Sequence, residues 1–471
     1  METTQNNKFE KFEKLIQEIM EKDKARGIAV KAFYKSGEII YEKYFGFKNE
    51  EEKTSIDENT IFGIASITKS FVALSILQLL EKGKLSLEDP ISKYIPYFKN
   101  ANIPYPVLIK HLLTHTPGYF PMKRTTIEDV IKNFPTEDTL ENEIVYNNNF
   151  SEESLKIICE QLNKENEFIG RPGEYISYFN DGYGILSEIV RKITGIPFAK
   201  YVEDNIIKPL NMNRTNLSYI KNISDENCAT LYTIKDEKVT IDKNFKNNAF
   251  ALCGAGAIKS TIADLSKYIL MFLSEGKINE NKIIDNFYLK EMLKPRIFIT
   301  HNSYYCYGLQ ISEIDNRRFI NHSGSLPGVS SCISFCPEEK IGIIILCNTM
   351  DVSVNTLNRA LFNLIIGKDE LIEKPKLNKI NWDKDSEVQV QGEYVTVEEE
   401  GEDFIIEKKE DNSFSMKRYG KEKELIPVFE NEGIVKGKLN DNFIFFLRNQ
   451  ENKIFAARFG ARVYKKKSKS N

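Results

Sequence analysis

A serine and a lysine three residues apart, Ser66 and Lys69, stand at the start of a segment with no other strong charge. From Ile67 to Leu80, apolar residues fall on every side of the expected helix, and such a helix is buried. Burial lowers the pKa of a lysine ammonium, which leaves a free amine able to take a proton from a hydroxyl. The pattern of Ser66 and Lys69 therefore indicates a nucleophile with its own general base. Because the spacing alone is common, catalysis depends on partners elsewhere in the chain.

Two further polar clusters supply such partners. A tyrosine near a lysine can have a lowered pKa and act as a proton shuttle, and an asparagine can orient a lysine and a substrate amide. Tyr178 and Asn180 offer this pair just before an expected helix at 181–194. The third cluster follows a strand-like run, where a glycine lets backbone approach a ligand closely and a strand edge can pair with a peptide-like substrate. Its members are His322, Ser323, Gly324 and Ser325.

The elements around these clusters define the fold class. An amphipathic helix at 9–24 and a hairpin at 27–47 open the chain, and strand-like runs return between 307 and 346. Between them, residues 65–220 are mainly helical, with a polar, irregular stretch at 119–150 that resembles an insertion or lid. Early and late strands with helices inserted between them predict one antiparallel sheet flanked by helices, an α+β fold with an all-helical subdomain.

A second domain is expected at the carboxyl end. A lysine- and proline-containing linker at 368–385 separates residues 1–367 from seven short strand-like runs between 394 and 459. Short strands at even spacing predict a small all-β barrel or sandwich over 386–471. We find no catalytic constellation there, so an accessory or packing role is the default. The basic residues at 465–469 are expected to form a frayed, solvated end.

Composition narrows the function classes. The 471 residues carry a formal net charge of −3, which gives no electrostatic case for binding nucleic acid. No run approaches the roughly 20 apolar residues of a membrane span, and the polar amino terminus lacks the apolar core of a signal peptide. Seven cysteines without paired spacing favour reduced thiols and a cytoplasmic location. His111 and His115 have metal-ligand spacing but no evident third ligand, so no metal site is predicted.

Taken in order, the three clusters resemble the motifs of the serine β-lactamase and penicillin-binding-protein superfamily. The nearest branch holds class C β-lactamases, D-amino-acid peptidases and related esterases. The likeness covers roughly residues 10–365, includes the runs 112–118 and 254–264, and implies the β-lactamase/transpeptidase-like fold with an accessory β-domain. Each motif is weak alone, whereas three in order beside a buried helix are specific. They read Ser66-Ile67-Thr68-Lys69, Tyr178-Phe179-Asn180 and His322-Ser323-Gly324.

The resemblance implies an acyl-enzyme serine hydrolase that needs no metal or organic cofactor. Ser66 would attack a carbonyl, while Lys69 and Tyr178 would share its proton, first as base and then as acid. Asn180 would position the lysine and the substrate. The backbone N–H groups of Ser66 and Ser325 would form the oxyanion hole.

One position departs from the superfamily's pattern. Many members carry Lys-Thr-Gly in the third motif, where this chain has His322 before Ser323 and Gly324. A lysine is a permanent cation suited to a substrate carboxylate, whereas a histidine is mostly neutral at pH 7. The departure favours a small ester, amide or D-amino-acid peptide as the substrate. A β-lactamase or DD-carboxypeptidase is the second hypothesis and a catalytically silent binding protein the third; the oligomeric state stays open.

Overall fold

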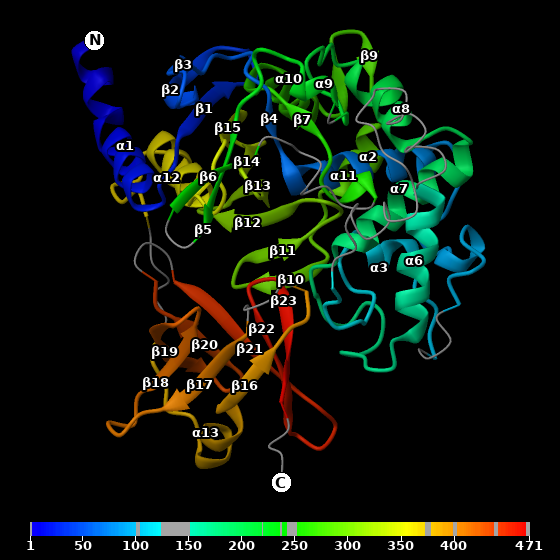
Figure 1. Ribbon diagram of the computed structural model, residues 1–471, viewed down its shortest axis with the longest axis vertical. Coiled ribbons are helices and arrows are strands. Elements are labelled where there is room, and N and C mark those ends of the chain that lie inside the picture. Colours follow the sequence, from blue (N-terminus) through cyan, green and yellow to red (C-terminus); the bar gives the residue numbers. More distant parts are fainter. Residues whose placement is uncertain are drawn as a thin grey trace.

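The computed structural model describes residues 2–99, 104–123, 151–218, 220–235, 238–242, 252–372, 378–398, 403–437 and 441–467. Figure 1 shows a large body of sheet and helices, with a smaller β-barrel formed by the carboxyl end of the chain. Most of the expected insertion, residues 124–150, lies outside the described residues. Within the described ranges, no helix combines the length and the apolar character needed to cross a membrane.

The large body is built on a nine-stranded antiparallel sheet in the order β10-β11-β12-β13-β14-β15-β1-β2-β3. β1 (Gly27–Tyr34) pairs with β15 (Ile341–Cys347) in a register that sets Ile28 opposite Cys347. Strands from both ends of the domain thus share one sheet, which confirms the predicted arrangement. The other strands are β2 (Ile39–Asn49), β3 (Thr54–Ser55), β10 (Ile297–Thr300), β11 (Ser303–Tyr305), β12 (Gln310–Ile314), β13 (Arg317–Leu326) and β14 (Val329–Cys336).

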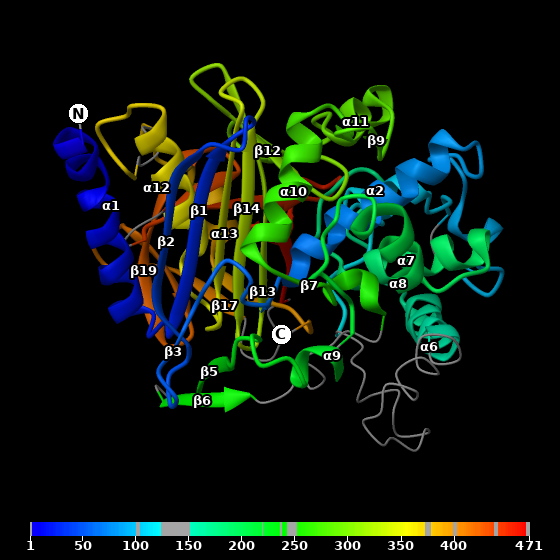
Figure 2. The ribbon, with the colours of Figure 1, turned by 90° about the horizontal axis from the view of Figure 1, so that it is seen from above.

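Helices cover both faces of the sheet. In Figure 2, α1 (Glu2–Lys22) and α12 (Val354–Ile365) lie on one side, and α10 (Ile262–Leu273) lies on the other. Because side chains alternate along a strand, β1 sends Ile28 and Val30 towards α1 and α12, and Ala29 towards α10. All seven cysteines are free thiols, as their spacing predicted.

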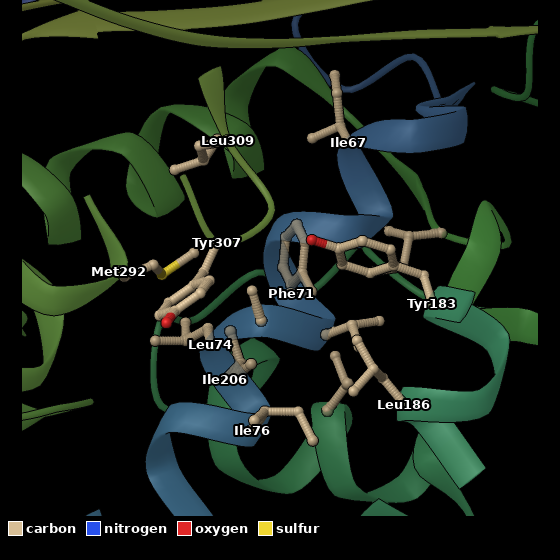
Figure 3. Packing of buried hydrophobic residues seen from close by; sticks show 14 of the residues in the cluster. Ile67, Phe71, Leu74, Ile76, Tyr183, Leu186, Ile206, Met292, Tyr307 and Leu309 are labelled. Atoms are coloured by element: carbon tan, nitrogen blue, oxygen red, sulfur yellow. The ribbon is translucent and has the colours of Figure 1, made fainter. Parts of the chain in front are cut away.

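α2 (Thr68–Glu81) is the centre of the helical part, and every residue from 68 to 79 is buried. Figure 3 shows the reason, since Phe71 and Leu74 on this helix meet side chains from several other segments. A helix surrounded in this way must be apolar on every face, as the sequence predicted. The labelled neighbours are Tyr183, Leu186, Ile206, Met292, Tyr307 and Leu309.

The remaining elements of the large body differ in length, and one helix, at 180–194, is largely buried. Its other helices are α3 (Ile109–Leu113), α6 (Ser151–Lys164), α7 (Asn180–Thr194), α8 (Phe198–Val202), α9 (Ile220–Ile223) and α11 (Asn286–Met292). Single turns of helix are η1 (Ala65–Ile67), η2 (Ile91–Lys93), η4 (Glu203–Ile207) and η5 (Cys253–Ala255). Small strand pairs are β4 (Phe62–Gly63) with β7 (Lys259–Ser260), β5 (Leu231–Lys235) with β6 (Lys238–Asp242), and β8 (Lys277–Ile278) with β9 (Asn281–Lys282).

The carboxyl end folds as a closed eight-stranded barrel, β16 to β23, beside α13 (Lys384–Val390). The strands are β16 (Gly392–Val395), β17 (Phe404–Lys408), β18 (Phe414–Arg418), β19 (Lys421–Phe429), β20 (Glu432–Val435), β21 (Asn442–Arg448), β22 (Ile454–Phe459) and β23 (Arg462–Lys466). Trp382, from the expected linker, is buried in the barrel core.

The last strand corrects one expectation. Residues 465 and 466, expected to belong to a frayed end, lie in β23, which pairs with β16 and closes the barrel through Tyr394 and Lys466. Val463 and Tyr464 are buried and anchor the strand. The run of lysines hid this strand, in which Lys465 and Lys466 are half-buried.

The barrel docks on the large body. The rings of Phe298 on β10 and Phe445 on β21 lie 5.6 Å apart, and His301 Nε2 is 2.9 Å from Glu432 Oε2. A small apolar cluster joins Ile169 to three barrel residues, Leu447, Ala456 and Val463. Val463 N–H also donates to Ser177 Oγ at 3.4 Å, so the barrel contacts the segment that leads to Tyr178.

Candidate active site

Ser66 lies in η1, the tight turn that leads into α2. Ala65, just before it, has a φ of 45°, in the left-handed region that costs a non-glycine residue about 1–3 kcal/mol. β13 passes directly over this turn. A side-chain carbon at Gly324 would lie 2.3 Å from the carbonyl oxygen of Ile64 and 2.9 Å from Ala65 Cβ. The third cluster therefore touches the turn of the serine because residue 324 has no side chain.

Lys69 is the second residue of α2, one turn after Ser66, and is fully buried, with 0% of its surface exposed. Its Nζ is 3.0 Å from Ser66 Oγ and donates a hydrogen bond to the carbonyl oxygen of Ala255 at 2.6 Å. The segment that carries Ala255 is tied to the same helix, since Ile258 N–H donates to Thr68 Oγ1 at 3.1 Å. The helix thus positions both the lysine and its anchor.

Electrostatics at Lys69 follow from its surroundings. Burial holds the pKa of this ammonium well below its usual range, and the positive charge of Arg462 lowers it further. The charges of Glu398 and Asp181 act in the opposite direction without reversing the shift. The shift increases the fraction of free amine, in the direction that the sequence predicted.

Tyr178 faces the same serine from the segment before α7. Its hydroxyl is hydrogen-bonded to Ser66, and its ring centroid is 5.0 Å from Lys69 Nζ. Burial raises the pKa of this phenol above its ordinary value, although the bond to Ser66 and the charge of Arg462 oppose the rise. The expected lowering of the Tyr178 pKa is therefore wrong, because desolvation outweighs the nearby positive charge. The phenol keeps its proton at neutral pH.

Asn180 is the first residue of α7 and is buried, with 8% of its surface exposed. Its Nδ2 donates to Glu398 Oε1 at 3.1 Å. Its Oδ1 is buried without a hydrogen-bond partner among the described residues. The structure thus brings Asn180 to the site, with the carboxamide held by a residue of the barrel.

His322 ends a chain of hydrogen bonds that runs in one direction. A carbonyl only accepts, so His322 Nδ1 donates to the Ser323 oxygen at 2.6 Å and Nε2 accepts from the Tyr305 hydroxyl at 3.1 Å. Tyr305 then accepts from His115 Nε2 at 3.0 Å, and His115 Nδ1 accepts from Phe179 N–H at 2.9 Å. Both rings are neutral in this pattern.

Burial explains why these imidazoles stay neutral. It lowers the pKa of His322 to about 3 and holds the pKa of His115 well below its usual range, and the charge of Lys69 adds to both shifts. His111 lies apart, with its Nδ1 accepting from Leu108 N–H at 3.1 Å. In the described part of the chain, no three metal-ligating side chains gather into a site.

Ser323 and Ser325 lie beyond His322 on β13, opposite Cys332 and Ser330 of β14. Ser323 is half-buried and Ser325 is exposed. Their strand is the one that crosses the turn of Ser66 at Gly324, so both serines belong to the edge of the site.

Two charged barrel residues at the site were missed from the sequence. Arg462 donates two hydrogen bonds to the Glu398 carboxylate, from Nε at 2.6 Å and from Nη2 at 3.2 Å. The Arg462 guanidinium carbon is 5.4 Å from the Tyr178 ring centroid, and Tyr178 N–H donates to the Ala461 oxygen at 2.7 Å. No local motif marks these residues, because their role depends on how the barrel docks.

The fold and the site together define a β-lactamase-like protein with a carboxyl-terminal barrel. Comparison with known proteins supports this class. The chain belongs to the Beta-lactamase family, whose model matches residues 12–364. It is 26% identical over 345 residues to Protein flp of Staphylococcus aureus, a match covering 73% of this chain and 64% of that protein. The chain thus matches less than two thirds of the length of that relative.

Two other proteins extend the comparison. Penicillin-binding protein 4* of Bacillus subtilis is 26% identical over 358 residues, covering 73% of this chain and 72% of the relative. The octameric penicillin-binding protein homologue from Pyrococcus abyssi superposes with a TM-score of 0.67 at 25% identity, covering 96% of this chain and 98% of the other. That structural match takes in the barrel as well as the large body.

Proposed function

We propose that this family member hydrolyses a small ester, amide or D-amino-acid peptide through an acyl-enzyme at Ser66. One observation carries the proposal, namely the 3.0 Å distance between Ser66 Oγ and a lysine amine whose pKa burial lowers. A hydroxyl next to an unprotonated amine has a base already in place. A silent binding protein would have no need of this buried pair.

The opposite pKa shifts of Lys69 and Tyr178 support the following order of proton transfers. Lys69, as the free amine, takes the Ser66 proton while the serine oxygen attacks the substrate carbonyl. The backbone N–H groups of Ser66 and Ser325 stabilise the oxyanion. Tyr178, which keeps its proton, donates it to the leaving group and regains one from the Lys69 ammonium. Water then cleaves the acyl-enzyme through the same transfers in reverse.

The third motif supports the substrate class. With a pKa of about 3, His322 offers no positive charge to a substrate carboxylate at neutral pH. Substrates that bind through an obligatory carboxylate, as penicillins would at a lysine in this place, are therefore disfavoured.

Penicillin binding is the second candidate, favoured by the names of the relatives. Two of the matched proteins are a penicillin-binding protein and a homologue of one. A β-lactamase or DD-carboxypeptidase activity would use the same serine and the same acyl-enzyme.

Intact-mass spectrometry distinguishes these candidates. The protein is exposed to 4-nitrophenyl butyrate, a D-alanyl 4-nitroanilide and a fluorescent penicillin, and the acyl mass shift is recorded for each. Ser66→Ala should remove every adduct, whereas Ser75→Ala should keep them, because Ser75 only bonds the Phe71 carbonyl inside α2. Labelling by the penicillin would promote the second candidate. A folded wild-type protein that no probe acylates would overturn the proposal.

A further inference from the structure

The barrel supplies a buried carboxylate to the candidate active site. Glu398 lies between β16 and β17, and its side chain is only 6% exposed. Arg462, at the start of β23, bonds both of its oxygens. Glu398 comes from the connection after β16 and Arg462 from β23, and the two residues meet beside Asn180. Glu398 is therefore held by the barrel itself and presented to the large body.

The carboxylate fixes the direction of the Asn180 carboxamide. Both Glu398 oxygens accept hydrogen bonds from the guanidinium of Arg462, and a guanidinium has only donors. Asn180 must then offer its NH₂ group to Glu398, as the 3.1 Å contact from Nδ2 shows. Turning the carboxamide over would set two acceptors against each other. The Oδ1 atom is consequently forced to the other side.

The side-chain oxygen of Asn180 is a hydrogen-bond acceptor without a donor. Oδ1 of Asn180 is buried and has no hydrogen-bond partner among the described residues, although buried polar atoms are nearly always paired. Asn180 stands two residues after Tyr178, whose hydroxyl contacts Ser66. An acceptor left open two residues after the tyrosine that contacts Ser66 suits a donor that arrives with the substrate.

We propose that Glu398 is a positioning residue that turns Asn180 so that the site selects substrates with an N–H group close to the scissile carbonyl. The inference rests on the proposed acyl-enzyme at Ser66 and narrows its substrate class to amides, peptides and N-acylated amino-acid esters. A carbonyl or ether oxygen at the same place would face Oδ1 and be disfavoured. The barrel is thereby a part of the active site.

Three esters that differ by one methyl group test the selection. N-acetylglycine 4-nitrophenyl ester carries the N–H, and the N-acetylsarcosine ester replaces its hydrogen with methyl. The N-acetyl-D-alanine ester adds the same methyl to the neighbouring carbon and keeps the N–H, so it controls for bulk. The wild type should prefer both N–H esters over the sarcosine ester by about tenfold or more in kcat/KM, the value of one hydrogen bond.

Variants of Glu398 connect the preference to this residue. Glu398→Gln can donate as well as accept, so Asn180 is free to turn and the preference should fall to about threefold or less. Glu398→Asp keeps a group that only accepts hydrogen bonds, so this variant should retain most of the preference for the N–H esters. Glu393→Gln makes the same change on β16, where the glutamate pairs with Lys467 at the barrel surface, and should leave the preference unchanged.

The outcomes separate this inference from the proposed function. No Ser66-dependent turnover of any ester would defeat the acyl-enzyme itself. Ser66-dependent turnover with equal rates on all three esters would overturn the N–H selection alone, and so would a preference that Glu398→Gln leaves intact. If Glu398→Gln does not fold, the wild-type preference and the Glu398→Asp variant decide the question.

Discussion

The side-chain nitrogen of Lys69 donates to the main-chain oxygen of Ala255 at 2.6 Å. This anchor is a neutral dipole, so it holds the amine beside Ser66 without requiring a positive charge on the lysine. Burial can then favour the free amine while the geometry stays fixed. Position and protonation state are set by two separate features of the fold.

The buried lysine should destabilise the protein as the pH falls. Its pKa is lowered in the folded state, so between that value and about 10.4 the unfolded chain binds a proton that the native chain does not. Each pKa unit of this shift corresponds to about 1.4 kcal/mol. Lys69→Met should therefore raise the melting temperature at pH 7 and flatten its dependence on pH. Scanning calorimetry from pH 6 to 10 measures both, with the exposed Lys84→Met as control. A lower melting temperature at pH 7 for Lys69→Met would contradict the prediction.

The two barrel charges should move the acid limb of the pH–rate profile in opposite directions. Activity needs the free amine, so kcat/KM falls when the pH drops below the Lys69 pKa. The charge of Glu398 raises that pKa and the charge of Arg462 lowers it. Glu398→Gln should shift the acid limb to lower pH, and Arg462→Gln should shift it to higher pH. Shifts of the same sign in both variants would show that the substitutions act by disturbing the packing of the site and not through their charge.

Tyr178→Phe should impair substrates according to their leaving group. Because Tyr178 keeps its proton at neutral pH, its proposed role is to protonate the leaving group. The loss in kcat/KM should reach roughly 10²–10⁴-fold for an amide and be much smaller for a 4-nitrophenyl ester, which departs without a proton. Tyr268→Phe removes another buried hydroxyl, one bonded to Ser70, and serves as the control. Equal losses on both substrates would argue against an acid role.

His322 should not titrate near neutrality. Its pKa of about 3 lies far below the usual value for a histidine, because the ring is buried next to Lys69. The ring carbon resonance of His322 in ¹³C-labelled protein should keep one position from pH 5 to 8, with His322→Asn used to assign it. A midpoint near 6.5 would mean that the ring is solvated and that the chain from His115 through Tyr305 does not form.

Much of the fold follows from local patterns. The segment from Ile67 to Leu80 is apolar on every face, and α2 is buried on every face. Strand-like runs at both ends of the first domain predicted one shared sheet, and β1 pairs with β15. Such predictions succeed because side-chain periodicity reports burial directly.

Other features could not be predicted from the sequence, because they depend on the balance between charge and burial in the folded protein. Lysines at 465 and 466 predicted a solvated end, yet Val463 and Tyr464 beside them hold β23 in the barrel. The direction of the Tyr178 pKa also depends on the balance between desolvation and neighbouring charge, which no sequence pattern gives.

The sequence by itself determined the order of the three polar clusters and the buried helix that carries Ser66 and Lys69, since both follow from residue types at short spacing. Only the tertiary structure decided that Glu398 and Arg462 reach Asn180 and Tyr178, more than two hundred residues earlier in the chain. The physical reason is that this contact arises from the docking of two separately closed hydrophobic cores, and the relative placement of such cores leaves no periodic signal in either segment.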